Sequence, residues 1–139
     1  MIIEKILPSQ FEAIPDFIAQ TFISLQKEVS LTQEEAFDIK LVLEEALTNA
    51  IKHGNQFDLK RHVTVCVTLL DGRLTISVKD EGVGFNADGV PDPTEKDKLM
   101  KTSGRGVYLI KKIMDEVHFK NGGREICMVK KLTNQRRPL

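Results

Sequence analysis

The sequence has little that would mark a secreted, membrane-spanning or nucleic-acid-binding protein. Lys+Arg and Asp+Glu number 20 each, so the formal net charge is zero. A chain without net positive charge is a poor candidate for general nucleic-acid binding, which relies on a basic surface. No apolar run approaches the roughly 18 residues of a membrane span, and residues 1–5 lack the basic-then-apolar order of a signal peptide. We therefore expect a cytoplasmic protein that contacts neither nucleic acid nor membrane directly.

Cysteine is also scarce. Cys66 and Cys127 are the two cysteines, and they are neither close in sequence nor part of a C-x-x-C pair. Both fall in strand-like runs, and disulfides are rare in the cytoplasm. We predict that both are buried free thiols.

The length of 139 residues suits one domain with one hydrophobic core. Apolar residues make up 41% and charged residues 29% of the chain, as in ordinary globular proteins. No internal repeat or low-complexity tract is present. We expect a single domain over residues 1–139, with residues 133–139 as a frayed polar tail.

Two helices are predicted in the first half of the chain. Apolar residues at helical spacing follow Ser9, which is a plausible N-cap with Glu12 as its capping-box partner. Pro15 either kinks this helix or marks its true start. The second helix should begin at Thr32, with Glu35 completing a capping box. It should run to about residue 52 or 53, followed by a glycine, Gly54, in the left-handed conformation.

Strand patterns dominate the second half. Asp71-Gly72 predicts a tight hairpin between two alternating runs. The expected elements are an edge strand over 1–7, strands over 62–69 and 73–79, a long loop from 86 to 103, a helix from 107 to about 115, and strands over 117–119 and 125–132. This order predicts the α+β class, with helices on one face of a mixed, mostly antiparallel sheet.

Three short motifs carry groups suited to binding a nucleotide. They are, in chain order, Glu45-x-x-x-Asn49, Asp80-x-Gly82-x-Gly84 and Gly104-x-Gly106. Taken singly, each also fits a plain structural interpretation: a solvated helix face, a turn after a strand, and the entry to a helix. Taken together, they combine an acid, a metal-binding amide and a glycine-led helix N-terminus, and such an N-terminus is a natural site for phosphate.

The chemistry of each motif follows from its residue types. Asp80, at a strand end, can accept a hydrogen bond from the exocyclic amine of adenine, a charge-assisted bond worth about 1.5–3 kcal/mol. The amide oxygen of Asn49 is a ligand that suits Mg²⁺, which usually takes one or two protein groups beside phosphates and water. Glu45, one helical turn earlier, can orient or deprotonate the group that attacks the γ-phosphate.

The three motifs, in this order, resemble the GHKL ATPase superfamily, whose fold is the Bergerat two-layer α/β sandwich. Within it, residues 44–54 and 80–85 are similar to the small bacterial anti-sigma-factor serine kinases, as are residues 104–110. The resemblance covers residues 32–132 or thereabouts. It implies that Glu45 is the catalytic base, Asn49 the Mg²⁺ ligand and Asp80 the adenine acceptor. It also implies that Gly82, Gly84, Gly104 and Gly106 form the backbone of the pocket, and that Lys98, Lys101, Thr102, Ser103 and Arg105 are lid-region candidates for phosphate contact.

The same resemblance implies cofactors and partners. Family members bind ATP or ADP with Mg²⁺ and phosphorylate a serine on an anti-anti-sigma protein of the STAS fold. Many sequester a sigma factor, and another partner-switching target is the alternative. A homodimer is a further expectation. An alternative function is a nucleotide-loaded binding module that sequesters a partner without phosphotransfer. A detached histidine-kinase domain is disfavoured because no phospho-accepting helical hairpin precedes the first motif.

Overall fold

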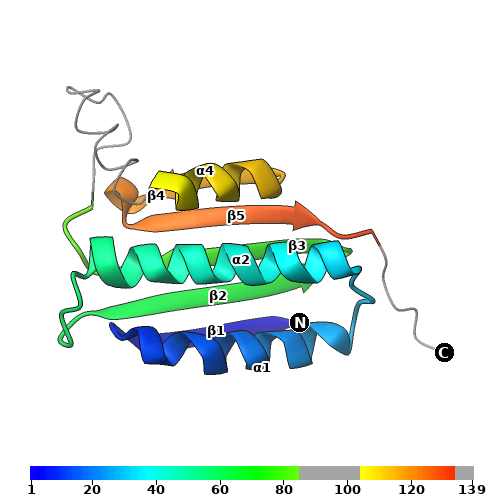
Figure 1. Cartoon of the computed structure of the whole chain (residues 1–139), viewed down its shortest axis with the longest axis horizontal. Helices are drawn as coiled ribbons and strands as arrows, with labels where there is room; N and C mark the ends of the chain where they lie inside the picture. The colour runs from blue at the N-terminus through cyan, green and yellow to red at the C-terminus, as the bar shows by residue number, and fades with distance from the viewer. Residues whose placement is uncertain (85–103, 134–139) are drawn as a thin grey trace.

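Three helices lie on one face of a five-stranded sheet in the computed structural model, which describes residues 1–84 and 104–133 (Figure 1). The helices are α1 (Ile14–Gln26), α2 (Gln33–Asn49) and α4 (Gly104–Ile113). The strands are β1 (Ile2–Pro8), β2 (His62–Leu70), β3 (Arg73–Lys79), β4 (Glu116–Lys120) and β5 (Glu125–Lys131). Three short helical segments are η1 (Phe11–Ala13), η2 (Ala50–Gly54) and η3 (Asn121–Gly123).

The strand order is β1-β2-β3-β5-β4, and each of these pairings is antiparallel. The first strand forms an edge, as its sequence predicts. The α+β class and the single helical layer are confirmed. None of the helices in these two ranges is both long and apolar enough to cross a membrane.

The core lies between the sheet and the helices. Alternate residues of β2 and β3 are buried, because successive side chains of a strand point to opposite faces. The buried side chains of α2 pack against them at spacings of three and four residues. The fully buried members of this core include Ile39, Leu43, Leu47, Val65, Val67, Leu74 and Ile76.

The predicted hairpin between β2 and β3 is confirmed. Asp71 and Gly72 both have positive φ angles, of 52° and 73°, and Leu70 pairs with Arg73 across the turn. Two central residues with positive φ define the type I′ turn, whose twist matches that of the flanking strands. The hairpin fixes the register of β3, and with it the place where this strand ends at residue 79.

The N-terminus of α2 is the predicted capping box. The N–H of Glu35 donates to Thr32 Oγ1 at 3.0 Å, and the N–H of Thr32 donates to Glu35 Oε1 at 3.1 Å. The second carboxylate oxygen of Glu35 accepts hydrogen bonds from the N–H and the hydroxyl of Thr133, at 3.0 and 3.2 Å. One buried carboxylate therefore caps α2 and also holds the segment that follows β5.

The predicted cap at Ser9 is wrong. Gln10 precedes η1 and makes no side-chain cap, and α1 itself begins at Ile14. Ser9 is buried and its hydroxyl donates instead to the carbonyl of Arg61 at 2.6 Å, because that distant segment lies beside it. Pro15 lies in the first turn of α1, so of its two readings it marks the start of the α-helix.

Two smaller expectations also need correction. Gly54 does not take the left-handed conformation, which falls to Gln56 and Phe57 with φ angles of 52° and 57°. Cys66 and Cys127 are free thiols, as predicted, but they are half-buried rather than buried. Each is paired with Ser77 from a neighbouring strand, on the sheet face that bears no helices, so the helical layer does not cover them.

Candidate functional site

A buried acid stands at the end of β3. Asp80 is 9% exposed, its N–H donates to the carbonyl of Arg124 at 2.9 Å, and its Oδ1 accepts from the N–H of Gly82 at 2.8 Å. Burial raises the pKa of this carboxyl, against the opposing effects of the Gly82 N–H and of the Arg124 and Arg61 charges. An acid kept at a strand end despite its burial is a candidate functional residue.

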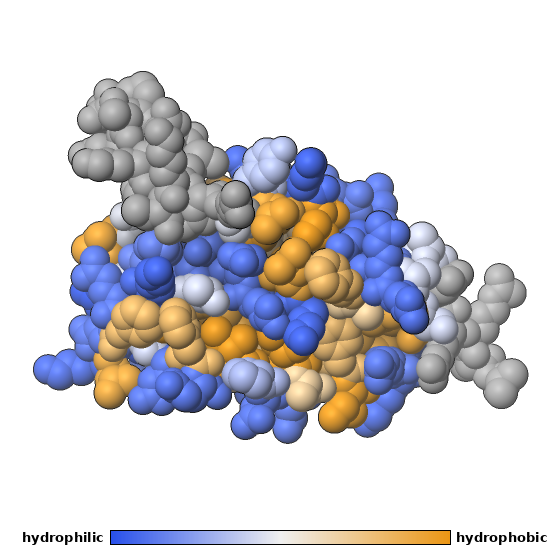
Figure 2. Space-filling view, viewed as in Figure 1, coloured by the Kyte–Doolittle hydropathy of each residue, from blue (hydrophilic) through white to orange (hydrophobic). Residues whose placement is uncertain are grey.

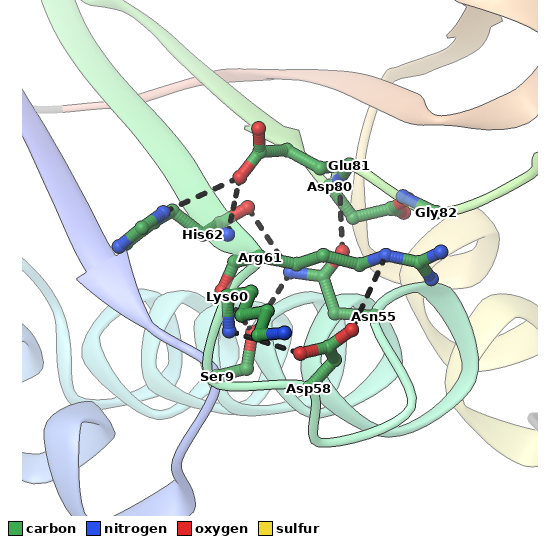
Figure 3. A network of polar contacts seen from close by, with 9 residues as sticks. All are labelled: Ser9, Asn55, Asp58, Lys60, Arg61, His62, Asp80, Glu81 and Gly82. Atoms are coloured by element: carbon green, nitrogen blue, oxygen red, sulfur yellow. Dashed lines mark hydrogen bonds and ion pairs between the residues drawn. The ribbon is translucent and has the colours of Figure 1, made fainter.

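The chain after α2 lies directly against this acid. A methyl group on Gly54 would overlap the Asp80 carboxylate, and one on Gly82 would overlap the carbonyl of Gly54. Figure 3 shows Asp80, Glu81 and Gly82 above the turn that carries Asn55. The two segments approach so closely because neither glycine has a side chain at the contact.

This close approach depends on a widened helical turn. At Ala50 the chain changes from α-helix to the π-helix η2, and the N–H of Asn55 donates to the carbonyl of Ala50 at 2.8 Å. A π-turn inserts one residue into a helix, and such turns are frequent at functional sites. The α2 helix therefore ends at Asn49, and the wider turn that follows brings Gly54 to Asp80.

A second group of residues gathers at the other end of the site, where α2 meets the first turn of α4. A methyl group on Gly106 would lie 2.5 Å from Glu45 Oε2 and 3.2 Å from Asn49 Nδ2. Both α2 side chains thus point at the glycine in the first turn of α4. Because the first N–H groups of a helix have no partner within it, this turn offers backbone donors beside a carboxylate and an amide.

Gly84 packs against the turn between β4 and β5, which lies beside the end of β3. Its φ angle is +73°, and a methyl group there would overlap the carbonyl oxygen of Gly122 in η3. Arg124, just after η3, donates from Nε to the carbonyl of Gly82 at 2.6 Å. The segment from 82 to 84 is therefore fixed on both sides, and glycine is needed at residue 84 for its conformation and for space.

Comparison with known proteins assigns the family. Residues 7–130 match the family described as Histidine kinase-like ATPase domain. The chain belongs to this family. It is 30% identical over 141 residues to the serine-protein kinase RsbW of Bacillus subtilis (strain 168), covering 96% of this chain and 88% of that protein. It is 35% identical over 120 residues to the anti-sigma F factor of Clostridium acetobutylicum, covering 83% of each chain. A third relative, the anti-sigma F factor of Bacillus thuringiensis (strain Al Hakam), is 34% identical over 134 residues, covering 90% of this chain and 91% of that protein.

In this histidine kinase-like ATPase domain, the structure collects the sequence-predicted residues into two groups. Glu45 and Asn49 meet Gly106, and Asp80 meets Gly82. Gly84 lies on the η3 turn, beside Asp80 and Gly82. Gly104 and Arg105 begin α4. The remaining lid candidates Lys98, Lys101, Thr102 and Ser103 lie outside the described residues.

Three residues of this ATPase domain site were missed by the sequence reasoning. Gly54 was predicted as a helix stop, whereas it is the surface on which Asp80 rests. Asn55 is fully buried and accepts from the N–H of Glu81 at 2.8 Å (Figure 3). Arg124 bonds both Asp80 and Gly82 through its backbone and side chain. A signal was present only for Asn55, as a polar residue directly after the 44–54 segment that resembles the family.

The donor set beside Gly106 suits magnesium. Within residues 1–84 and 104–133, no three His, Cys, Asp or Glu side chains form a cluster able to hold a metal ion. Asn49 and Glu45 supply an amide and a carboxylate, both half-buried and both facing Gly106. Mg²⁺ takes oxygen ligands and commonly keeps only one or two from protein, the rest coming from phosphates and water. The residues present therefore fit a nucleotide-borne Mg²⁺.

Proposed function

We propose that this chain is an ATP-dependent serine protein kinase that acts as an anti-sigma regulatory factor. It would bind ATP with Mg²⁺, transfer the γ-phosphoryl group to a serine of a STAS-type anti-anti-sigma protein, and sequester a sigma factor. The observation that carries the proposal is the convergence of Glu45 and Asn49 on Gly106 at one end of the site, with buried Asp80 at the other. The names of the relatives, serine-protein kinase and anti-sigma F factor, supply the reaction and the partner class.

Each end of the site has a distinct task in this proposal. The Asp80 carboxylate accepts a hydrogen bond from the 6-amino group of adenine, and the glycines at 54 and 82 let the two backbone segments lie close together beside this acid. The first turn of α4 donates backbone N–H groups to the phosphates. Asn49 contributes an oxygen to Mg²⁺, which when bound neutralises charge on the β- and γ-phosphates.

Glu45 provides the base for the transfer. The serine hydroxyl oxygen forms a bond to the γ-phosphorus, the bond from that phosphorus to the β–γ bridging oxygen breaks, and ADP leaves with the electron pair. The proton of the hydroxyl passes to the Glu45 carboxylate. Positioned base catalysis of this kind contributes about 10²–10⁴-fold to a rate.

The surface of the helical layer has exposed apolar side chains that favour the proposed binding of a protein partner. Ile23 of α1, Phe37 of α2 and Tyr108 of α4 are 58%, 67% and 61% exposed. Figure 2 shows apolar and polar areas interleaved over this face of the molecule. Exposed apolar side chains rimmed by polar ones offer contact area to another protein.

The alternative is a binding module that holds nucleotide and sequesters a partner without transferring phosphate. The presence of Glu45 beside Asn49 favours the kinase, because a pure binder has no need of a base beside the metal ligand.

The deciding experiment is incubation of the purified chain with γ-labelled ATP, Mg²⁺ and a cognate STAS protein. We expect label on one STAS serine, and none on the matched serine-to-alanine STAS variant. Tight ATP binding without label on any tested STAS protein would overturn the kinase and favour the sequestering module.

A further inference from the structure

A buried amide joins three segments of the chain next to the acid of the site. Asn55 is 0% exposed, and its side chain makes three hydrogen bonds, each to a residue distant in sequence or in the next strand. Its Oδ1 accepts from the N–H of Glu81 at 2.8 Å. Its Nδ2 donates to Ser9 Oγ and to the carbonyl of His62, both at 3.0 Å (Figure 3).

These bonds allow one orientation of the amide. The N–H of Glu81 is a donor, and the carbonyl of His62 is an acceptor, so a flipped amide would set donor against donor and acceptor against acceptor. Ser9 is itself fixed, since its hydroxyl donates to the carbonyl of Arg61 at 2.6 Å. The contacts of Nδ2 with Ser9 and His62 therefore hold the Asn55 oxygen toward the N–H of Glu81.

The bond to Glu81 acts on the peptide that follows Asp80. The peptide group between Asp80 and Glu81 is attached to the Cα of Asp80 at one end, and its N–H bonds Asn55 at the other. The residue before Asn55 is Gly54, which the Asp80 carboxylate touches, and a methyl group on Gly82 would overlap its carbonyl. A movement of the Asn55–Glu81 bond would therefore move the acid relative to the surface on which it rests.

We propose that Asn55 is a positioning residue that fixes the Asp80 carboxylate for base recognition and so sets the preference for adenine over guanine nucleotides. This inference rests on the proposed nucleotide site. Adenine presents an amino group at the position where guanine presents a carbonyl oxygen. A fixed carboxylate accepts from the first and repels the second, whereas a carboxylate free to shift discriminates less between them.

Base preference separates positioning from a merely structural role. A variant that only destabilises the fold lowers the folded fraction, and so lowers the apparent affinities for ATP and GTP by one common factor. Their ratio stays constant. A variant that releases Asp80 lowers the ratio itself, because only the contact with the base is affected.

The experiment is calorimetric titration of ATP and of GTP, each with Mg²⁺, into the full chain and three variants. Asn55→Ala removes the acceptor and both donors. Asn55→Asp keeps an acceptor for the Glu81 N–H and loses the donors. Ser9→Ala is the matched control, because it removes one partner of Asn55 and leaves the bond to Glu81 in place.

We expect the wild-type chain to prefer ATP by at least about tenfold, the factor that one charge-assisted hydrogen bond supplies. We expect Asn55→Ala to bring the ratio to within about threefold of unity, and Ser9→Ala and Asn55→Asp to keep most of the preference. An unchanged ratio in Asn55→Ala, or an equal fall in Ser9→Ala, would overturn the positioning role. If Asn55→Ala does not fold, Asn55→Asp decides, and loss of its preference would overturn the role. Failure of the wild-type chain to bind either nucleotide would instead contradict the proposed function.

Discussion

The Asp80 carboxylate rests on the backbone of Gly54, and a methyl group at residue 54 would overlap it. We predict that Gly54→Ala displaces this carboxylate and weakens ATP binding by at least about tenfold, through loss of the hydrogen bond to the base. Crowding of this kind also costs about 1–3 kcal/mol of folding free energy. Calorimetric titration and urea unfolding measure the two effects.

The matched control for Gly54→Ala is Gly72→Ala in the β2–β3 hairpin, at the opposite end of β3. Gly72 has a φ of 73°, so alanine there costs about 1–2 kcal/mol through backbone strain. The control should lose stability and keep its ATP affinity. If both variants lose affinity alike, the steric argument at residue 54 is wrong.

Asp80 is predicted to lower the stability of the fold at neutral pH and to strengthen the binding of ATP. Burial raises its pKa in the folded chain above the unfolded value, so its contribution to stability is fully present below the unfolded pKa and is lost as pH rises through the folded pKa. Asp80→Asn should therefore be as stable as wild type, or more stable, at neutral pH. It should also bind ATP about 10–100-fold more weakly. Thermal unfolding followed from about pH 3, below the unfolded pKa of about 3.9, to neutral pH should show the advantage of the variant growing with pH. A variant less stable than wild type at neutral pH would contradict this account.

Glu35 has the opposite dependence on pH. Burial alone would raise its pKa, but hydrogen bonds from Thr32 and Thr133 outweigh burial and lower it. Its stabilising contribution is present above the unfolded pKa of about 4.3 and is lost as pH falls through the lower folded pKa. Glu35→Gln should cost about 1–2 kcal/mol at neutral pH, and less in acid. The exposed neighbour Glu34, in the same helical turn, gives the control Glu34→Gln, which should change stability by less than about 0.5 kcal/mol.

Glu45→Gln should separate binding from transfer. The amide keeps the size of the side chain beside Gly106 but cannot take the proton of the serine hydroxyl, so transfer should fall by about 10²–10⁴-fold with ATP affinity nearly unchanged. Single-turnover transfer of label to the STAS protein measures the first quantity. The control is the adjacent Glu44, whose Oε1 lies 3.9 Å from Lys40 Nζ. Glu44→Gln should leave transfer intact. A normal rate in Glu45→Gln would remove this residue from the chemistry.

Asn49→Ala should abolish transfer and leave the fold intact. The side chain is half-buried at the last position of α2, where alanine is the better helix former, so the free energy of unfolding should not fall by more than about 0.5 kcal/mol. Titration of ATP with and without Mg²⁺ should show that Mg²⁺ strengthens binding in wild type and has little effect in the variant. Equal dependence on Mg²⁺ in both would argue against Asn49 as the metal ligand.

Local patterns predicted those elements that local interactions determine. The capping box of Thr32 and Glu35 and the turn at Asp71-Gly72 involve residues within three positions of one another, and both are confirmed. The acid at the end of β3 was visible because a strand pattern stops there.

Contacts between segments that are distant in sequence determine the features that the local patterns did not predict. Ser9 fits a local capping pattern, yet its hydroxyl bonds Arg61, 52 residues away. Gly54 fits a helix stop, yet a glycine is required there because a side chain would overlap the carboxylate of Asp80, 26 residues further along the chain. A sequence pattern cannot show which backbone will pass beside a given glycine. The contact of Asp80 with Gly54 could therefore be found only from the fold.

The central claim is a nucleotide site that runs from Asn49, at the end of α2, along η2 to the Asp80 carboxylate. Calorimetric titration of ATP into the wild-type chain and into Asp80→Asn, both in magnesium buffer, tests it most directly. We predict saturable heat with one nucleotide per chain for wild type, and binding at least about tenfold weaker for the variant. No heat with the wild-type chain, or identical isotherms for the two proteins, would contradict the account.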